Sequence, residues 1–330
     1  MTVSRRSLFA LIGGGIVAGR FGSGAAAGKP PVVGVLWHAA DAQQEAAFRG
    51  PLREGFEKLD YVDGQTVVFD ECYAAEDPER FKSCAAELVG RHVDVLIAGS
   101  VPAALAAQRA TSTIPIVLVA NPDPVGLKLV ASLSHPGGNI TGLSTIAFDL
   151  AAKRVQILKE ALPALSGVAL LVNPNAPGDA TRLLAEMTPA LDQLHLKADA
   201  VEAHQPGEIA GALDRVVSGG FGAVIVSQNA LFFNERKQIA DLALQRRLPT
   251  MVPADLFVEA GALMSYGPSW PPLFRRAAVF ADRIFKGAKP ADLPVEQPTI
   301  FALTINRRTA DALVLKLPPT LLGRADQVIE

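Results

Sequence analysis

The sequence predicts an α/β protein made of two similar Rossmann-like lobes with parallel sheets, joined by a hinge that the chain crosses several times. Three observations predict it. Continuous apolar runs of strand length alternate with segments of helical periodicity, the pattern of a parallel sheet covered on both faces. The same order of elements occurs twice, with equivalent strands about 130 residues apart. A further helix, strand and short helix follow the second copy, so the chain is expected to return between the lobes.

The first lobe is predicted to begin at residue 31 with a buried strand. Its helices show one apolar face, as in Leu52, Phe56 and Leu59, and the third has Pro102 near its first turn, where proline is tolerated. The strands are predicted at 32–37, 66–73, 93–99, 114–120 and 139–144, and the helices at 43–59, 78–91 and 102–110.

The second lobe repeats this plan and is followed by the returning segment. Its predicted strands are 167–172, 197–203, 221–227, 248–252 and 262–267, and its helices 180–194, 209–217 and 233–246. The returning segment has a helix at 272–286, a strand at 299–306 and a short helix at 307–313. The chain is expected to cross between the lobes near residues 141–144, 265–268 and 301–305. The lobes are therefore predicted as residues 31–143 with about 268–298, and 145–265 with about 301–330.

The first 27 residues are typical of an export signal. Arg5 and Arg6 precede a mildly apolar, glycine-rich segment, and Ala25–Ala27 offers a small-residue cleavage site. The paired arginines favour a twin-arginine signal, and the segment is less apolar than a membrane-spanning helix requires. An ordinary secretory signal and an uncleaved anchor remain alternatives. The protein is predicted to be exported to the periplasm as a soluble protein.

Composition and motifs exclude several classes of function. The 330 residues carry a formal net charge of -2, which gives no basic field for nucleic acid. The sequence contains no phosphate-binding loop, nucleophile elbow or zinc-protease motif, and its five histidines lack the spacing of paired metal ligands. No cofactor and no metal site is predicted, and the protein is expected to be a monomer.

Polar corners at the ends of the predicted strands indicate a binding site, because ligands of open α/β sheets bind at the carboxyl ends of strands. Ser100 and the following helix could bind an anion. Asp123 or Asp255 could hold an ammonium group. An aromatic side chain such as Trp37 could cover an apolar body. These corners together predict a small zwitterion or polar metabolite as ligand. The predicted ligand-binding residues are Trp37, Ser100, Asp123, Ser144, Asn173, Asn229 and Asp255.

Each corner also has a purely structural interpretation. Asn and Asp beside proline are common in turns, and Ser100 and Asp255 are suited to capping helices. Pro122 and Pro124 flank Asp123 and fix its backbone, so its carboxylate is either aimed at a ligand or caps the next turn. Another question stays open for the two cysteines, Cys72 and Cys84, which could form a disulfide in an exported protein.

Long stretches of the chain resemble the substrate-binding proteins of ABC transporters, of the type specific for tryptophan and other aromatic amino acids. The resemblance covers residues 32–330, and its longest runs are "AAELVGRHVDVLIAGSVPAALAAQRATSTIPIVLVANPDPVGLKLVASLSHPGGNITGLST", "LFFNERKQIADLALQRRLP" and "PPTLLGRADQVIE". It implies a type I periplasmic-binding-protein fold that closes on a ligand, without catalysis. It implies that Ser100, Asp123, Ser144, Asn229 and Asp255 surround the ligand, with Trp37 and Asn173 as walls.

The predicted function is therefore capture of a small solute, an amino acid or related metabolite, and its delivery to an inner-membrane ABC permease. The chain departs from the family where the bulky pair Trp37-His38 follows the first strand, which would narrow the cleft for an aromatic ligand. Two alternatives stay open. One is a periplasmic sensor that passes a ligand signal to another protein. The other is an α/β enzyme that uses Asp123 or Asp255 as acid or base.

Overall fold

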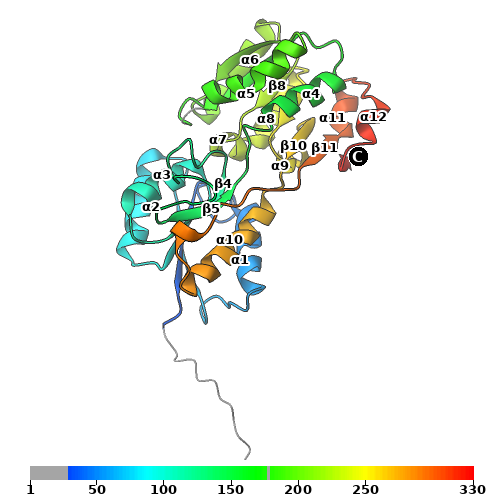
Figure 1. The fold of residues 1–330 in the computed structure, drawn as a ribbon. Coiled ribbons are helices and arrows are strands. Elements are labelled where there is room, and N and C mark those ends of the chain that lie inside the picture. The colour runs from blue at the N-terminus through cyan, green and yellow to red at the C-terminus, as the bar shows by residue number, and fades with distance from the viewer. Residues whose placement is uncertain (1–28, 177–178) are drawn as a thin grey trace, which may run out of the picture.

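The computed structural model describes residues 29–176 and 179–330. The predicted export signal, residues 1–27, lies outside the described residues. Within the described part of the chain, no helix is both long enough and apolar enough to cross a membrane. The described strands form two sheets, one of five strands and one of seven, so the α/β prediction with two lobes is confirmed. Figure 1 shows them as a lower and an upper lobe.

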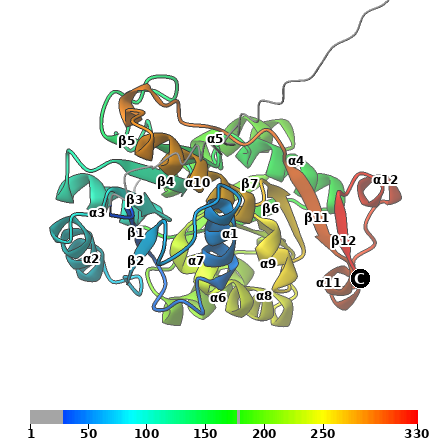
Figure 2. The ribbon, with the colours of Figure 1, turned by 90° about the horizontal axis from the view of Figure 1, so that it is seen from below.

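The first lobe is a five-stranded parallel sheet with helices on both faces. Its strand order is β2-β1-β3-β4-β5. One face is covered by α1 and α10, which lie side by side in Figures 1 and 2, and the other by α2 and α3. The elements are β1 (Val32–Trp37), α1 (Ala46–Glu57), β2 (Val68–Tyr73), α2 (Pro78–Gly90), β3 (Val95–Ala98), α3 (Val101–Ala110), β4 (Ile116–Asn121), β5 (Ile140–Ser144) and α10 (Pro271–Phe285).

The second lobe has a seven-stranded sheet of order β12-β11-β10-β9-β8-β6-β7. The strands from β6 to β10 are parallel as predicted, but β11 runs antiparallel to β10. The elements are α4 (Ala151–Ala161), β6 (Gly167–Val172), α5 (Asp179–Gln193), β7 (Lys197–Glu202), α6 (Ile209–Ser218), β8 (Val224–Val226), α7 (Ala230–Asn234), α8 (Arg236–Gln245), β9 (Thr250–Val252), α9 (Asp255–Glu259), β10 (Met264–Gly267), β11 (Ala302–Asn306), α11 (Arg307–Ala312), α12 (Pro319–Leu322) and β12 (Gln327–Ile329).

Both sheets are wound in the same way. The order β2-β1-β3-β4-β5 in the first lobe corresponds to β7-β6-β8-β9-β10 in the second. In each sheet the winding direction reverses beside the first strand, between β1 and β3 and between β6 and β8. Such a reversal leaves a crevice at the carboxyl ends of the two strands, because the loops that follow them go to opposite faces. The topology therefore predicts where each lobe offers a binding surface.

The chain passes between the sheets at residues 144–151, 267–271 and 296–302 of the described part. Beside β5, Glu296 forms a bridge with Leu143 before the last crossing. The buried Arg154 of α4 joins the first crossing to the end of β10, just before the second crossing. Its Nε donates to the Tyr266 carbonyl at 2.8 Å and its Nη1 to the Ala147 carbonyl at 2.9 Å. Burial lowers the pKa of this guanidinium to about 10. Arg154 is thus a fixed point between adjacent segments that connect the lobes.

Two local expectations differ from the structure. The predicted helix 233–246 is two helices, α7 and α8, with a break at Glu235. The helix α4 was not predicted, although its apolar residues Val155 and Leu158 are helically spaced and buried. The helix α4 packs with α5 on the same face of the second sheet, which buries these apolar residues.

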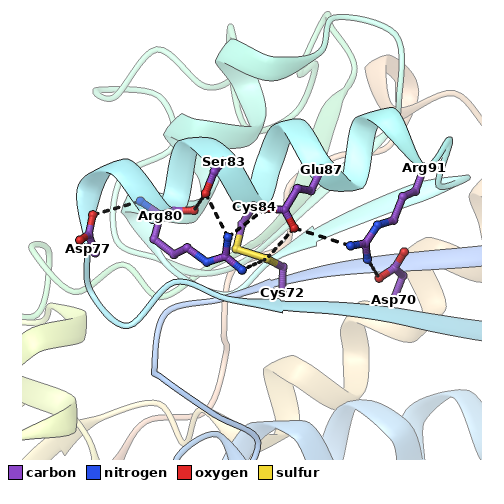
Figure 3. The surroundings of a disulfide bond; sticks show 8 residues. All are labelled: Asp70, Cys72, Asp77, Arg80, Ser83, Cys84, Glu87 and Arg91. Carbon is purple, nitrogen blue, oxygen red and sulfur yellow. Dashed lines mark hydrogen bonds and ion pairs between the residues drawn. A yellow bond between two sulfur atoms is a disulfide. The ribbon is translucent and has the colours of Figure 1, made fainter.

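Cys72 of β2 and Cys84 of α2 form a disulfide, which answers the question that the sequence left open (Figure 3). Their Cα atoms lie 5.6 Å apart, and both residues are buried. The Asp77 side chain caps α2 by accepting from the backbone N–H groups of Glu79 and Arg80. The disulfide therefore closes the segment 72–84, which joins the end of β2 to the first two turns of α2.

Candidate functional site

A cavity of about 820 Å³ lies between the two lobes. It is lined by residues that follow the strands on both sides, as expected for a site at the carboxyl ends of two facing sheets. The reversal points supply His38 and Ser100 from the first lobe, and Asn173 and Asn229 from the second. The cavity therefore forms where the two winding reversals face each other.

Ser100 and Asn229 each stand at the start of a helix. Ser100 caps α3, with its Oγ accepting from the Ala103 N–H at 3.3 Å. Its hydroxyl proton remains available as a donor. Asn229 caps α7 by accepting from the Phe232 N–H at 3.0 Å, and its amide nitrogen donates to Ser227 at 3.0 Å. These residues give the cavity oriented hydrogen-bond donors from both lobes.

Four of the seven predicted residues line the cavity, namely Ser100, Asp123, Asn173 and Asn229. Their contact with a ligand remains a prediction. The other three, Trp37, Ser144 and Asp255, lie outside the lining, so the structure does not bring all seven to one cavity. Trp37 is the last residue of β1, and its side chain points into the lobe, where it stacks on Phe274 with ring centroids 5.8 Å apart. Side chains alternate along a strand, so the neighbouring His38 faces the cavity instead.

Ser144 and Asp255 also lie outside the lining. Ser144 ends β5 at the edge of its sheet, and its buried Oγ accepts from the Ile146 N–H at 3.3 Å. Asp255 follows β9 and begins α9, with its carboxylate accepting from the Leu256 N–H at 2.9 Å. Both are polar groups used by the local backbone, in line with the structural interpretation of these corners.

One end of the cavity, which we call the aspartate end, contains Asp123, Arg182 and Gln228. The Asp123 carboxylate forms an ion pair with Arg182 of the opposite lobe, and its other oxygen accepts from the Gly126 N–H at 2.9 Å. The Gln228 amide nitrogen donates to the Ala120 carbonyl and to the Thr145 hydroxyl, both at 3.0 Å. Both oxygens of Asp123 are therefore engaged by protein groups.

The opposite end, which we call the glutamate end, contains His38, Glu76 and Asn234. One oxygen of Glu76 lies 2.9 Å from His38 Nδ1 and accepts from the Asn234 amide of the second lobe at 3.2 Å. Ala75 and Glu76 both adopt a left-handed backbone, with φ of 51° and 58°. Such a conformation costs on the order of 1 kcal/mol for a residue other than glycine. The structure thus keeps Glu76 in a strained position that directs its carboxylate along the cavity.

Aromatic side chains form the wall beside the glutamate end. Phe48 stacks on Phe274 with centroids 4.5 Å apart and lies 4.7 Å from Phe233 of the other lobe. Trp270 lies 5.4 Å from Phe233. The His38 ring is 6.1 Å from Phe233, which places the polar pair next to the aromatic wall. All five of these side chains line the cavity.

The His38 imidazole is buried between two carboxylates. Its Nε2 lies 3.6 Å from Glu45, and Glu45 also accepts from the backbone N–H groups of His38 and Ala39. Burial by itself lowers the pKa of His38, but Glu45 and Glu76 outweigh it, so the pKa is raised above its ordinary value. Burial raises the pKa of Glu45. The two carboxylates therefore favour the protonated form of the imidazole, and His38 holds Glu76 in place.

Several residues of the cavity were not among the seven predicted. Glu76 follows β2, and the sequence search for polar strand ends did not include that strand. Phe48 and Phe233 occur on helices whose apolar spacing looked like ordinary core packing. Trp270 and Arg182 come from segments with no local signal of a site, since they meet the cavity only through tertiary packing. A complete search of strand ends would have found Glu76.

The cavity has the composition of a binding site. It combines an aromatic wall with oriented polar groups, and it is open between two lobes that are linked by several segments. Among the described residues, no group of three or more His, Cys, Asp or Glu side chains could hold a metal ion. The arrangement can enclose a small molecule with one flat apolar part and one polar part.

Comparison with known proteins identifies related chains. Residues 35–329 match the family described as ABC transporter substrate binding protein. A tyrosine-binding protein of Clostridioides difficile is 27% identical over 268 residues, which cover 79% of this chain and 74% of that protein. A conserved domain protein of Vibrio cholerae is 27% identical, with a TM-score of 0.84 over 91% of this chain and all of that one. A Streptococcus pneumoniae ABC domain in complex with L-Trp is 24% identical, with a TM-score of 0.81 over 90% of this chain and all of that one.

Proposed function

Since this chain belongs to the ABC transporter substrate-binding protein family, we propose that it binds an amino acid with an aromatic side chain and delivers it, as a monomeric periplasmic protein, to an inner-membrane permease for import. The observation that carries the proposal is the cavity between the lobes, whose lining combines aromatic side chains with helix-capping polar groups. The family consists of substrate-binding proteins, which favours binding over catalysis.

The polar groups at the reversal points suit the backbone of an amino acid. The Ser100 hydroxyl and the start of α3 offer donors to a carboxylate, and the positive end of the helix dipole favours a negative charge there. Asn173 and Asn229 lie across the cavity in the second lobe. Contacts to both lobes would stabilise the closed arrangement, which is how a ligand can shift a hinge equilibrium.

The aromatic wall suits the side chain of such a ligand. Phe48 and Phe233 come from opposite lobes, and their ring centroids lie 4.7 Å apart. Both are almost fully buried and line the cavity, so a ligand ring beside them would be close to both lobes. The relatives agree with this choice, since one is named for tyrosine and another was solved with L-Trp. Trp37 does not narrow the cavity, because it is buried in the lobe, whereas His38 lines the cavity.

Binding of amino acids to the purified protein tests this proposal. We expect L-tyrosine or L-tryptophan, at a hundred times the dissociation constant, to raise the free energy of unfolding by about 2.7 kcal/mol. The double variant Ser100→Ala/Asn229→Ala should bind at least tenfold more weakly, whereas Asp255→Asn, outside the cavity, should bind like the wild type. If no amino acid changes the melting temperature or gives heat in calorimetry, the proposed ligand class is wrong. Loss of amino-acid uptake in a strain lacking the gene would separate importer from sensor.

A further inference from the structure

The carboxylate of Glu76 keeps one oxygen without a protein partner in the described part of the structure. Its Oε1 is held by His38 and Asn234, whereas no donor from the described residues reaches Oε2. The side chain is 24% exposed and lines the cavity, so this oxygen is accessible to a ligand. Asp123, at the other end, has both oxygens engaged by Arg182 and Gly126. The cavity therefore presents an available carboxylate acceptor at the glutamate end.

This acceptor lies at the aromatic wall and far from the aspartate end. Glu76 follows β2 and Asp123 follows β4, and three strand spacings separate these strands, about 14 Å. Glu76 is bonded to His38, whose ring lies 6.1 Å from Phe233 and 6.4 Å from Phe48. These phenylalanines are almost fully buried and reach the cavity with little of their surface. A ligand ring in this part of the cavity would lie beside Glu76, and a donor on that ring would meet the carboxylate oxygen.

Glu76 is also held more firmly than an ordinary surface carboxylate. Its backbone is left-handed, its N–H donates to the His38 carbonyl at 2.8 Å, and it lies in the segment closed by the disulfide of Cys72 and Cys84. His38 and Asn234 fix the side chain from both lobes. A carboxylate that is fixed before binding gives directional recognition, because little ordering is left for the ligand to impose.

We propose that Glu76 is a specificity-determining residue that accepts a hydrogen bond from a donor on the ligand's aromatic ring, a phenol hydroxyl or an indole N–H. This inference rests on the proposed function, since it concerns the ring of an aromatic amino acid in the same cavity. Glu76 would favour a ligand with a donor on its ring over a ligand of the same shape without that donor. A ligand that lacks the donor leaves the Glu76 carboxylate without a partner in a buried site, and this weakens its binding.

Calorimetry with L-tyrosine, L-tryptophan and L-phenylalanine tests the inference. For the wild type we expect L-tyrosine or L-tryptophan to bind at least tenfold more tightly than L-phenylalanine. Glu76→Met removes the acceptor and should reduce this ratio to near one by weakening only the ligands with a ring donor. Glu76→Gln keeps a carbonyl acceptor and should retain part of the ratio. Asp255→Asn makes the same carboxylate-to-amide change outside the cavity and should leave the ratio unchanged.

The other outcomes are distinguishable. If L-phenylalanine binds the wild type as tightly as L-tyrosine, the inference is wrong while the proposed function stands. If Glu76→Gln weakens all three ligands equally, Glu76 holds the ammonium group or shapes the cleft, and the inference is again overturned. The pair 3-(4-hydroxyphenyl)propanoate and 3-phenylpropanoate, which lack the ammonium group, should keep the preference for the hydroxyl. If none of the three amino acids binds the wild type, the proposed function fails, and this inference fails with it.

Discussion

The two ends of the cavity both contain a carboxylate and both join the lobes, but they do so differently. At the aspartate end, Asp123 is neutralised by Arg182 of the opposite lobe and also caps its own turn. At the glutamate end, Glu76 shares one oxygen between His38 and Asn234 and keeps the other available. The two carboxylates therefore differ in whether the protein leaves one oxygen available.

The two ends also differ in how they are anchored. Glu76 lies in a strained segment that the disulfide closes, next to the capped start of α2. Asp123 lies in a turn where its own side chain accepts from the Gly126 N–H and the Asn121 side chain accepts from the Asp123 N–H. A covalent anchor is expected to matter most where the native backbone is strained, because the strain otherwise favours local rearrangement.

The largest effect is expected from removing the disulfide. Replacing Cys72 and Cys84 together by alanine should lower the free energy of unfolding by about 3 kcal/mol. The disulfide closes the segment 72–84 and so lowers the conformational entropy of the unfolded chain. Urea denaturation measures this loss. The same variant should weaken the preference for ligands with a ring donor, because Glu76 lies within the closed segment.

A stability unchanged by the double substitution would show that the segment 72–84 is held without the bridge. Both proteins measured in reducing and in oxidising buffer provide a control, because the reductant should lower the free energy of unfolding of the wild type only. A loss of stability without any change in ligand preference would show that the disulfide supports the lobe but not the glutamate end.

A smaller effect is expected at the aspartate end. Asp123→Asn removes the ion pair with Arg182 but keeps an oxygen that can accept from the Gly126 N–H. Arg182 is 37% exposed, so solvent screens the pair, and we expect the free energy of unfolding to fall by no more than about 1 kcal/mol. The affinity for L-tyrosine should change less than tenfold.

Arg182→Gln is the matched variant from the other lobe and should give a similar result. A loss of affinity well above tenfold in Asp123→Asn, with an unchanged melting temperature, would instead support the role that the sequence suggested, a direct contact with the ligand. Thermal denaturation and calorimetry on the same samples separate these outcomes.

The smallest effect is expected from pH, through the cluster behind the glutamate end. The pKa of His38 is raised because Glu45 and Glu76 outweigh the opposing effects of burial and of Arg236. A raised folded pKa stabilises the fold fully below the ordinary value of 6.5, and this stability is lost as pH rises through the folded pKa. The free energy of unfolding should therefore decrease from about pH 6.5 upward.

Urea denaturation across this range should show the decrease in the wild type and a flatter profile in His38→Gln. The raised pKa of Glu45 acts in the same direction, but its contribution begins at lower pH, from about 4.5. A wild-type profile that is flat or rises above pH 6.5 would contradict the raised pKa of His38. Asp123→Asn should show the same slope as the wild type, because its end of the cavity does not contain His38.

The sequence by itself determined the fold and the general position of the site. Apolar runs alternate with amphipathic segments because each strand must be buried on both faces, and the repeated order of elements indicates two lobes of the same winding. Ser100 and Asn229 could be found from sequence because each follows a buried strand and begins a helix, so local chemistry and topology point to the same place.

Only the tertiary structure decided which polar groups face the cavity and which remain available there. Trp37 and His38 are neighbours, yet the alternation of side chains along β1 sends one into the core and the other to the site. Asp123 and Glu76 are both carboxylates in loops that follow strands. Their partners differ, because Arg182 reaches Asp123 and His38 reaches Glu76. These partners come from distant segments, and no local pattern encodes contacts that exist only once both lobes have folded.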